Sequence, residues 1–276
     1  MFHVRSSGLT DTGLLRSHNE DCFEIDDQHR VYIVADGMGG HNHGEVASRI
    51  AVESMHAFIA QSEDHDSTLP IAYDHSISHH SNRIKRSIHV AHDQVLNAIR
   101  EDGSLLGMGT TVVGAMLRGS TLAVAHVGDS RAYRMRNGHL ELLTQDHTWV
   151  NEQVVAGYLS EDQAKSHPLK NVVTRALGGD SEVVVDLSEV AVVPGDLFLL
   201  CSDGLTTMMS DQDIHARLAS DEPLDAVCHR MVEDANARGG FDNITVLLLT
   251  VDDAAADDDD TDDTVASGTA KELDED

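Results

Sequence analysis

The chain has 276 residues, 41% of them apolar, which is enough to bury the core of one large domain. Its formal charge of −29 argues against binding to DNA or to an anionic membrane, because both need a basic surface. No stretch approaches the roughly 18 apolar residues that cross a bilayer, and Cys22, Cys201 and Cys228 form no CxxC pair. We therefore expect a cytoplasmic protein with buried free thiols rather than disulfides or a structural zinc site.

Short runs rich in Val, Ile and Leu, each bounded by Gly, Asp or Asn, predict strands throughout the first 251 residues. The runs are Val31–Ala35, Thr111–Leu117, Leu122–Val127, Ala132–Met135, Val183–Leu187, Leu197–Cys201 and Ile244–Val251. Arg118-Gly119-Ser120 and Asn137-Gly138 fit the turns of β-hairpins, which favours antiparallel pairing.

Apolar residues at helical spacing predict four helices between these strands. The helices are expected at Gly44–Ala60, Ser81–Arg100, Ser210–Ala219 and Pro223–Ala237. Helices placed between groups of hairpin strands favour an α+β sandwich over an alternating parallel sheet. Between about residues 146 and 179 the apolar periodicity weakens, so we expect a surface flap that carries a short helix.

Four aspartates lie at the ends of apolar runs. Carboxylates gathered at one end of a sheet cost several kcal/mol unless a cation neutralises them or some become protonated. Oxygen ligands without Cys or His at ligand spacing favour Mg²⁺ or Mn²⁺ over Zn²⁺. Any single Asp-Gly pair is more often a simple turn, but four such sites together favour a metal centre. The four sites are Asp36-Gly37, Gly128-Asp129, Asp203-Gly204 and Asp242-Asn243.

A polar cluster, Arg16-Ser17-His18-Asn19-Glu20-Asp21, precedes the first predicted strand. The planar guanidinium of Arg16 matches two phosphate oxygens and could orient a phosphoryl group beside the metals. The alternative is an ordinary surface ion pair between Arg16 and a neighbouring acid.

Six motifs resemble, in order and spacing, those of the metal-dependent protein phosphatases, the protein phosphatase 2C family. The resemblance runs from about Ser6 to Val251, and the DGMGG form and compact length are similar to the bacterial branch. The motifs are RSHNED (16–21), ADGMGG (35–40), GTT (109–111), HVGDSRAY (126–133), CSDGL (201–205) and DNIT (242–245).

The resemblance implies a four-layer α-β-β-α sandwich of two antiparallel sheets, with a flap subdomain at about residues 146–175. It places two Mn²⁺ or Mg²⁺ ions at one end of the sandwich. Asp36 would bridge both ions and the carbonyl of Gly37 would bind the second. Asp203 and Asp242 would complete the shell of the first ion, and Asp129 would bind a third, weaker one.

The resemblance also gives roles to the cluster that precedes the first predicted strand. Glu20 and Asp21 would lie near the metals, often through water, and Arg16 would grip the substrate phosphate, which makes Arg16 and Asp36 the catalytic residues. Animal members carry a histidine after the Asp-Gly pair, proposed as the proton donor to the leaving group. Here Met38 takes its place, and a thioether holds no proton to donate.

The implied reaction is hydrolysis of phosphoserine or phosphothreonine by direct attack of the water that bridges the metals, without a phosphoenzyme. Its partners would be phosphoproteins, including a Ser/Thr protein kinase or the substrates of one, with no nucleic acid and no membrane; we expect a monomer. Two alternatives stay open: an inactive pseudophosphatase that only binds phosphoproteins, and a phosphatase for a small phosphate ester.

The last segment, residues 252–276, carries twelve acidic residues and one lysine. A segment so charged and so poor in large apolar side chains cannot repay the entropy of ordering, so we expect a disordered tail after a domain of residues 1–251. The tail is most simply a solvating extension. The alternative is that it competes for the metal site or repels acidic phosphopeptides.

Overall fold

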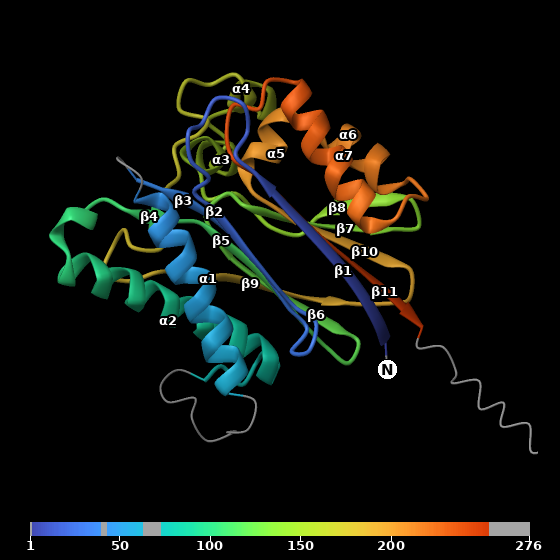
Figure 1. Cartoon of the computed structure of the whole chain (residues 1–276), viewed down its shortest axis with the longest axis horizontal. Helices are drawn as coiled ribbons and strands as arrows, with labels where there is room; N and C mark the ends of the chain where they lie inside the picture. Colours follow the sequence, from blue (N-terminus) through green and yellow to red (C-terminus); the bar gives the residue numbers. More distant parts are fainter. Residues whose placement is uncertain (1, 40–42, 63–72, 254–276) are drawn as a thin grey trace, which may run out of the picture.

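Two antiparallel sheets lie face to face at the centre of the computed structural model, which describes residues 2–39, 43–62 and 73–253 (Figure 1). One sheet has the strand order β1-β11-β10-β7-β8 and the other β2-β3-β5-β6-β9, with β4 paired to β3. The strands are β1 (Phe2–Asp11), β2 (Asp21–Asp26), β3 (Val31–Met38), β4 (Gly109–Thr110), β5 (Val112–Arg118), β6 (Thr121–Val127), β7 (Arg131–Arg136), β8 (His139–Leu142), β9 (Asp186–Ala191), β10 (Asp196–Cys201) and β11 (Ile244–Asp253).

Helices cover the outer face of each sheet, which confirms the predicted four-layer α+β sandwich (Figure 1). The α1–α2 pair packs on the sheet that contains β3, and α5, α6 and α7 pack on the sheet that contains β11. The helices are α1 (Gly44–Gln61), α2 (His79–Glu101), the 3₁₀ turn η1 (Gly103–Leu105), α3 (Trp149–Val155), α4 (Glu161–Lys165), α5 (Asp203–Met208), α6 (Asp211–Leu218) and α7 (Leu224–Ala237).

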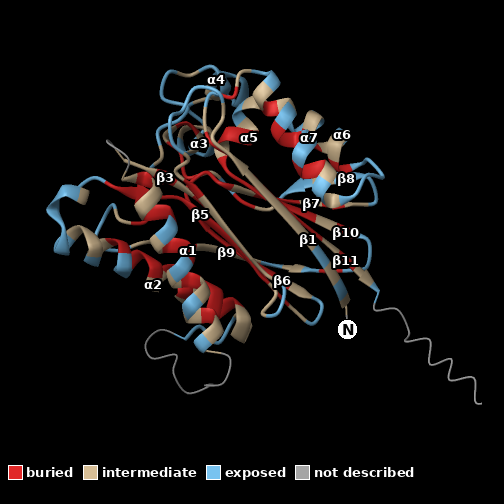
Figure 2. Cartoon of the chain, viewed as in Figure 1, coloured by how far each residue is buried: buried red, intermediate tan, exposed pale blue. Residues whose placement is uncertain are grey.

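The core consists of layers on both sides of each sheet, and strand β3 shows why. Val31, Ile33 and Ala35 pack toward α1 and α2, whereas Tyr32 and Val34 point between the sheets, and all five are fully buried. Because alternate side chains leave opposite faces of a strand, a strand buried on both faces is a continuous apolar run. Figure 2 shows these buried residues along both sheets and on the inner sides of the helices.

Several elements differ from the prediction. Strands β1 and β2 were not predicted, because they are half-buried and rich in polar side chains. Strand β9 lies at Asp186–Ala191 instead of Val183–Leu187, since its pairing with β6 starts only at Asp186. The flap holds two short helices, α3 and α4, where one was expected.

The ends of the described chain bear on the predicted domain division. Strand β11 extends to Asp253, and Asp252 pairs with Arg5 at 3.0 Å. The predicted disorder of the tail concerns residues that, from 254 onward, lie outside the described part, so the division stays a prediction. Within the described ranges, no helix is long and apolar enough to cross a bilayer. All three cysteines are free, as predicted, and Cys201 and Cys228 are buried, whereas Cys22 is only partly buried.

Candidate metal centre

Asp36 lies near the end of β3, where its backbone is held from both sides. Its carbonyl accepts from the Thr111 amide at 2.9 Å and the Thr110 hydroxyl at 2.9 Å, and its amide donates to Thr111 Oγ1 at 3.3 Å. On the other side, Asp21 of β2 is its register partner. The GTT motif therefore fixes Asp36, and the β2–β3 pairing brings a second carboxylate beside it.

Gly37 allows three segments to meet behind the site. A Cβ atom at Gly37 would lie 2.1 Å from the Gly44 carbonyl oxygen at the start of α1, so a larger residue would push the helix away. The Gly37 amide donates to the Glu20 carbonyl at 3.1 Å, and the Gly44 amide donates to Glu20 Oε1 at 3.2 Å. Glu20 thus faces the positive end of α1, where a carboxylate is stabilised.

Asp203 and Asp242 come from two different connections that pack closely together. Asp203 is the first residue of α5, and Asp242 lies two residues before β11. A Cβ atom at Gly204 would lie 1.9 Å from the Asn243 carbonyl oxygen, so only glycine permits this approach. The Asn243 side chain donates to the carbonyls of Thr12 and His18, both at 2.9 Å, and its Oδ1 accepts from the Glu20 amide at 2.8 Å.

Asp21 is buried beside Asp36, and one of its two carboxylate oxygens has no hydrogen-bond partner. Its Oδ2 accepts from the hydroxyls of Ser202 at 2.7 Å and Thr245 at 2.6 Å, whereas its buried Oδ1 has no hydrogen-bond partner. Burial raises the pKa of Asp21 to about 7, and the charges of Asp203 and Asp242 add to the rise although the two hydroxyls oppose it. A buried oxygen without a partner is costly unless an ion or water completes it.

The neighbouring carboxylates show the same electrostatic pattern. Burial, followed by the charges of Asp21 and Asp203, raises the pKa of Asp36 well above its ordinary value. Burial and Asp203 raise the pKa of Asp129 to about 8, and burial and Asp242 raise that of Asp203 to about 6. Each ionised acid makes its neighbours harder to ionise, and the positive charges of the chain do not balance this repulsion.

These residues fit a divalent cation site. The donors are carboxylate and carbonyl oxygens, which suit Mg²⁺ and Mn²⁺, and Asp21, whose buried Oδ1 has no partner, is close enough to Asp203 and Asp242 for their charges to raise its pKa. Among the described residues, no three of these aspartates place one oxygen each within 4.8 Å of the other two.

Arg16 lies at the edge of the carboxylate cluster and is half exposed, with 48% of its side chain accessible. Its Nη2 donates to Asp242 Oδ2 at 2.7 Å. Partial burial lowers the pKa of Arg16, but Asp242, Glu20 and Asp36 together raise it by more, so the guanidinium stays charged. An exposed, permanently charged fork next to the acids is available to an anionic ligand.

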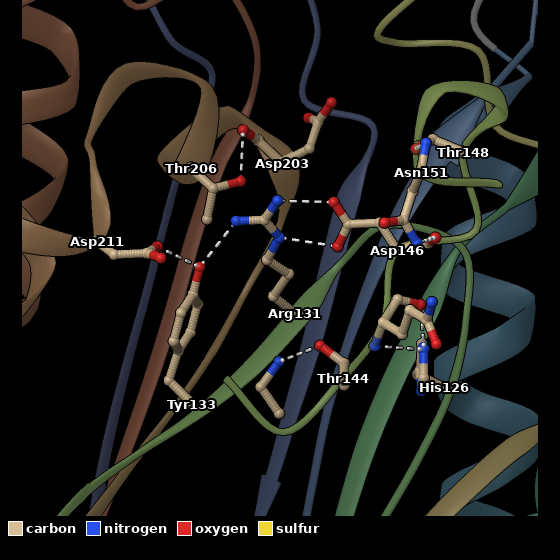
Figure 3. Close-up of polar contacts among 12 residues, drawn as sticks. His126, Arg131, Tyr133, Thr144, Asp146, Thr148, Asn151, Asp203, Thr206 and Asp211 are labelled. Atoms are coloured by element: carbon tan, nitrogen blue, oxygen red, sulfur yellow. Dashed lines mark hydrogen bonds and ion pairs between the residues drawn. The ribbon is translucent and has the colours of Figure 1, made fainter. Parts of the chain in front are cut away.

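Asp129 approaches the cluster from the end of β6, beside the flap. Gly128 has φ +107°, and a Cβ atom there would lie 2.5 Å from Thr111 Cβ, so the turn before Asp129 requires glycine. Figure 3 shows the neighbouring Arg131 between Asp146 and Tyr133. Arg131 donates to both Asp146 oxygens, at 2.8 and 2.7 Å. Asp146, where the flap begins, is thus paired with a cation of the chain, whereas the charge of Arg131 offsets the raised pKa of Asp129 only in part.

The comparison with known families agrees with this geometry. The family model described as "Protein phosphatase 2C" matches residues 16–242, most of the chain. The chain belongs to the protein phosphatase 2C family. The match begins at Arg16 and ends at Asp242, so it spans all the site residues predicted above.

Relatives within the family are bacterial. The chain is 39% identical over 243 residues to "Serine/threonine phosphatase stp" of Listeria welshimeri, covering 87% of this chain and 93% of that protein. It is 34% identical to "Protein phosphatase PhpP" of Streptococcus pneumoniae over 247 residues, covering 88% and 96%. The crystal structure of the Mycobacterium tuberculosis phosphatase PstP/Ppp superposes with a TM-score of 0.81 at 32% identity, covering 91% and 100%. The catalytic domain of PstP "in complex with 2 Manganese ions" gives 0.78 at 32% identity, covering 92% and 100%.

The predicted class of protein is therefore confirmed: the chain is a metal-dependent serine/threonine protein phosphatase that uses Mn²⁺ or Mg²⁺. All seven predicted metal residues lie at one end of the sandwich, on the ends of β2, β3 and β6 and the connections next to β10 and β11. The individual ligand roles stay predictions. Sequence analysis did not identify two supporting residues. Asn243 connects two loops by a hydrogen bond to Glu20, which is far away in the sequence, and Asp146 pairs with Arg131 across a turn.

Proposed function

We propose that this 2C-family chain hydrolyses phosphoserine and phosphothreonine in proteins at the cluster of Asp36, Asp203 and Asp242. The proposal rests on a group of buried acids that no positive charge of the chain balances. Burial and mutual repulsion raise the pKa of all of them: Asp21, Asp36, Asp129 and Asp203. Structural acids are normally paired, so a group of unpaired buried acids indicates a functional site.

Each acid would have a distinct part in holding the ions. Asp36, fixed by the GTT motif, would be shared between two ions, with the Gly37 carbonyl on the second and Asp203 and Asp242 on the first. Asp129 would take a third, weaker ion, and Glu20 and Asp21 would act through water. Two bound Mn²⁺ or Mg²⁺ ions lower the pKa of a water and neutralise phosphoryl charge.

Arg16 would bind the phosphate of the substrate by exchanging its hydrogen bond to Asp242 for phosphate oxygens. A water attacks phosphorus in line, the bond from phosphorus to the serine or threonine oxygen breaks, and its electron pair leaves with that oxygen. The leaving oxygen would take its proton from metal-bound water or another group, because the thioether of Met38 has none.

The state of Cys201 agrees with direct attack by water, because this thiol cannot act as the nucleophile. Cys201 is fully buried on β10 and burial raises its pKa to about 12, so it is a neutral packing residue and no nucleophile. The proposal extends to a cytoplasmic monomer that acts on a Ser/Thr protein kinase or its substrates. Three free cysteines support the reducing compartment.

The test is turnover of a phosphothreonine peptide, with free phosphoserine as second substrate, in chelator and then in Mn²⁺ or Mg²⁺. We expect no turnover in chelator and full recovery with metal. Peptide binding without turnover in any metal would instead indicate a binding module, and hydrolysis of free phosphoserine alone would indicate a small-ester phosphatase.

A matched pair of arginine variants tests the role of Arg16. Arg16→Ala should lower kcat/KM for the peptide by about 10²-fold, because a charge-assisted contact to the phosphate is lost. Arg5→Ala is the control, since Arg5 is also exposed and paired with an aspartate but lies far along β1. Equal effects of the two substitutions would remove Arg16 from the site.

A further inference from the structure

Three large apolar side chains are exposed directly beside the candidate site. Leu14, Leu15 and Phe241 are 64%, 68% and 55% accessible. Leu14 and Leu15 immediately precede Arg16, and Phe241 immediately precedes Asp242. Single exposed apolar residues are ordinary on a protein surface, but three together next to a binding residue are not. We call Leu14, Leu15 and Phe241 the apolar rim.

The rim is one surface, although its members are more than 220 positions apart in the chain. The amides of Leu14 and Leu15 both donate to the Gly240 carbonyl, at 2.8 and 3.3 Å. A Cβ atom at Gly240 would lie 3.0 Å from Leu14 Cγ, so the leucine side chain covers the backbone next to Phe241. Arg16 and Asp242 close the same pair of loops through their ion pair at 2.7 Å.

The two loops are fixed in shape, so the rim cannot fold inward to bury itself. Asn243 donates to the carbonyls of Thr12 and His18 on either side of the leucines, both at 2.9 Å. Gly13 has φ +76°, and a Cβ atom there would lie 2.2 Å from the Asp242 carbonyl oxygen. A frame held by such contacts keeps apolar side chains in water, which is unfavourable unless a ligand covers them.

We infer that the apolar rim is a substrate subsite that takes a large apolar side chain next to the phosphorylated residue of a protein. The inference rests on the proposed function, because it requires the phosphate to lie on Arg16. Consecutive residues of an extended peptide are about 3.3–3.6 Å apart, so residues flanking a phosphate on Arg16 reach the neighbours of Arg16.

The charge of the surroundings agrees with this occupant. The chain has a formal charge of −29, which two bound divalent cations would offset only in part. An acidic residue beside the phosphate would be repelled there, whereas an apolar side chain gains from leaving water without adding charge.

The experiment compares two phosphothreonine peptides that differ only in having leucines or serines on both sides of the phosphorylated residue, together with para-nitrophenyl phosphate. For the unmodified protein in Mn²⁺, we expect kcat/KM about tenfold higher for the leucine peptide, mostly through KM. Leu14→Ser and Leu15→Ser should each reduce this preference about threefold, and adding Phe241→Ser should remove it. Turnover of para-nitrophenyl phosphate, which has no flanking residue, should stay within twofold.

Val193→Ser is the matched control, because Val193 is an exposed apolar residue (42%) in the turn before β10, away from Arg16. It should leave the preference intact. The inference is overturned if the unmodified protein shows no preference, if the triple variant keeps it, or if Val193→Ser removes it equally. If no substrate is hydrolysed, the proposed function fails, and the same preference is then measured as binding of the two peptides, with the same outcomes deciding.

Discussion

The two ends of strand β2 carry the same residue type in opposite electrostatic states. Burial raises the pKa of Asp26, but the His29 amide at 2.9 Å, His29 Nδ1 at 2.6 Å and His56 Nε2 at 2.8 Å, all directed at its carboxylate, lower the pKa overall. Asp21, five residues earlier, keeps one oxygen without a partner and has a pKa of about 7. Both oxygens of Asp26 have partners within the chain, two of them imidazole rings, whereas Asp21 has hydroxyl partners on one oxygen only and is repelled by the charges of Asp203 and Asp242.

This difference separates a structural acid from a ligand-binding acid without reference to any relative. The Asp26 cluster joins the end of β2 to α1 through contacts within the chain. The carboxylates around Asp21 are held by an equally ordered frame of hydroxyls and amides, yet their charge is left unbalanced. A fold that positions acids firmly and leaves them unpaired is prepared for a cation.

The largest effect is expected from Asp36→Asn, which removes one carboxylate from the unpaired group around Asp21. We expect turnover of the phosphothreonine peptide in Mn²⁺ to fall about 10³-fold, because the residue that we propose is shared by both ions is lost. The metal-free protein should become about 1 kcal/mol more stable, since repulsion decreases. Turnover assays and thermal unfolding in chelator measure the two effects.

The opposite signs of the two effects make the Asp36 test specific. A misfolded variant would lose both activity and stability, whereas a lost ligand costs activity alone. Unchanged turnover would remove Asp36 from the catalytic centre, and a lower midpoint in chelator would show that repulsion is not what raises its pKa.

A smaller effect should appear as pH dependence of the metal-free protein. The raised pKa values of Asp21, about 7, and Asp129, about 8, mean that the folded state holds protons that the unfolded state has released. Their stabilising contribution is complete below about pH 4 and is lost as pH rises through those values. Between pH 6.5 and 8.5 we expect stability in chelator to fall by about 2 kcal/mol, or roughly 4–8 °C in midpoint.

That pH window avoids the opposing effect of four histidines. Burial lowers the pKa of His80, His89, His126 and His147, so their contribution to stability is lost as pH falls and does not change above about pH 6.5. Saturating Mn²⁺ should abolish the decline, because bound cations hold the carboxylates ionised. A metal-free midpoint that is constant or rises across this window would contradict the protonated cluster.

Local sequence was sufficient for the parts of the site that end apolar runs. The runs before Asp36, Asp129 and Asp203 predicted strands that the structure contains, because residues buried on both faces of a sheet are apolar without interruption. The motifs identified the family, and with it the fold. Nothing in the spacing alone showed that these ends meet in space.

The elements missed by the sequence depend on distant partners. Strand β1 is polar and half-buried, and its ladder with β11 joins Phe2 to Asp253, so no local pattern marks it. Helix α5 starts directly at Asp203 and is only six residues long, too short for a periodic signal. Asp26 contacts His56 across 30 positions, so the spacing of the histidines did not indicate this pairing.

The smallest expected effect comes from Asp26→Asn at the balanced end of the same strand. The amide keeps the shape of the carboxylate but loses its charge and one acceptor oxygen, so its remaining oxygen can accept either from the two imidazole rings, which both contact Oδ2, or from the His29 amide, which contacts Oδ1. Because Asp26 is mostly buried, with 11% of its side chain accessible, we expect a loss of about 1 kcal/mol, or roughly 2–4 °C in the unfolding midpoint, with unchanged turnover. The same Asp→Asn exchange would thus stabilise the metal-free protein at position 36 and destabilise it at position 26. Thermal unfolding of both variants in chelator measures this reversal, and a change of the same sign in both would show that pairing within the chain does not distinguish the two ends.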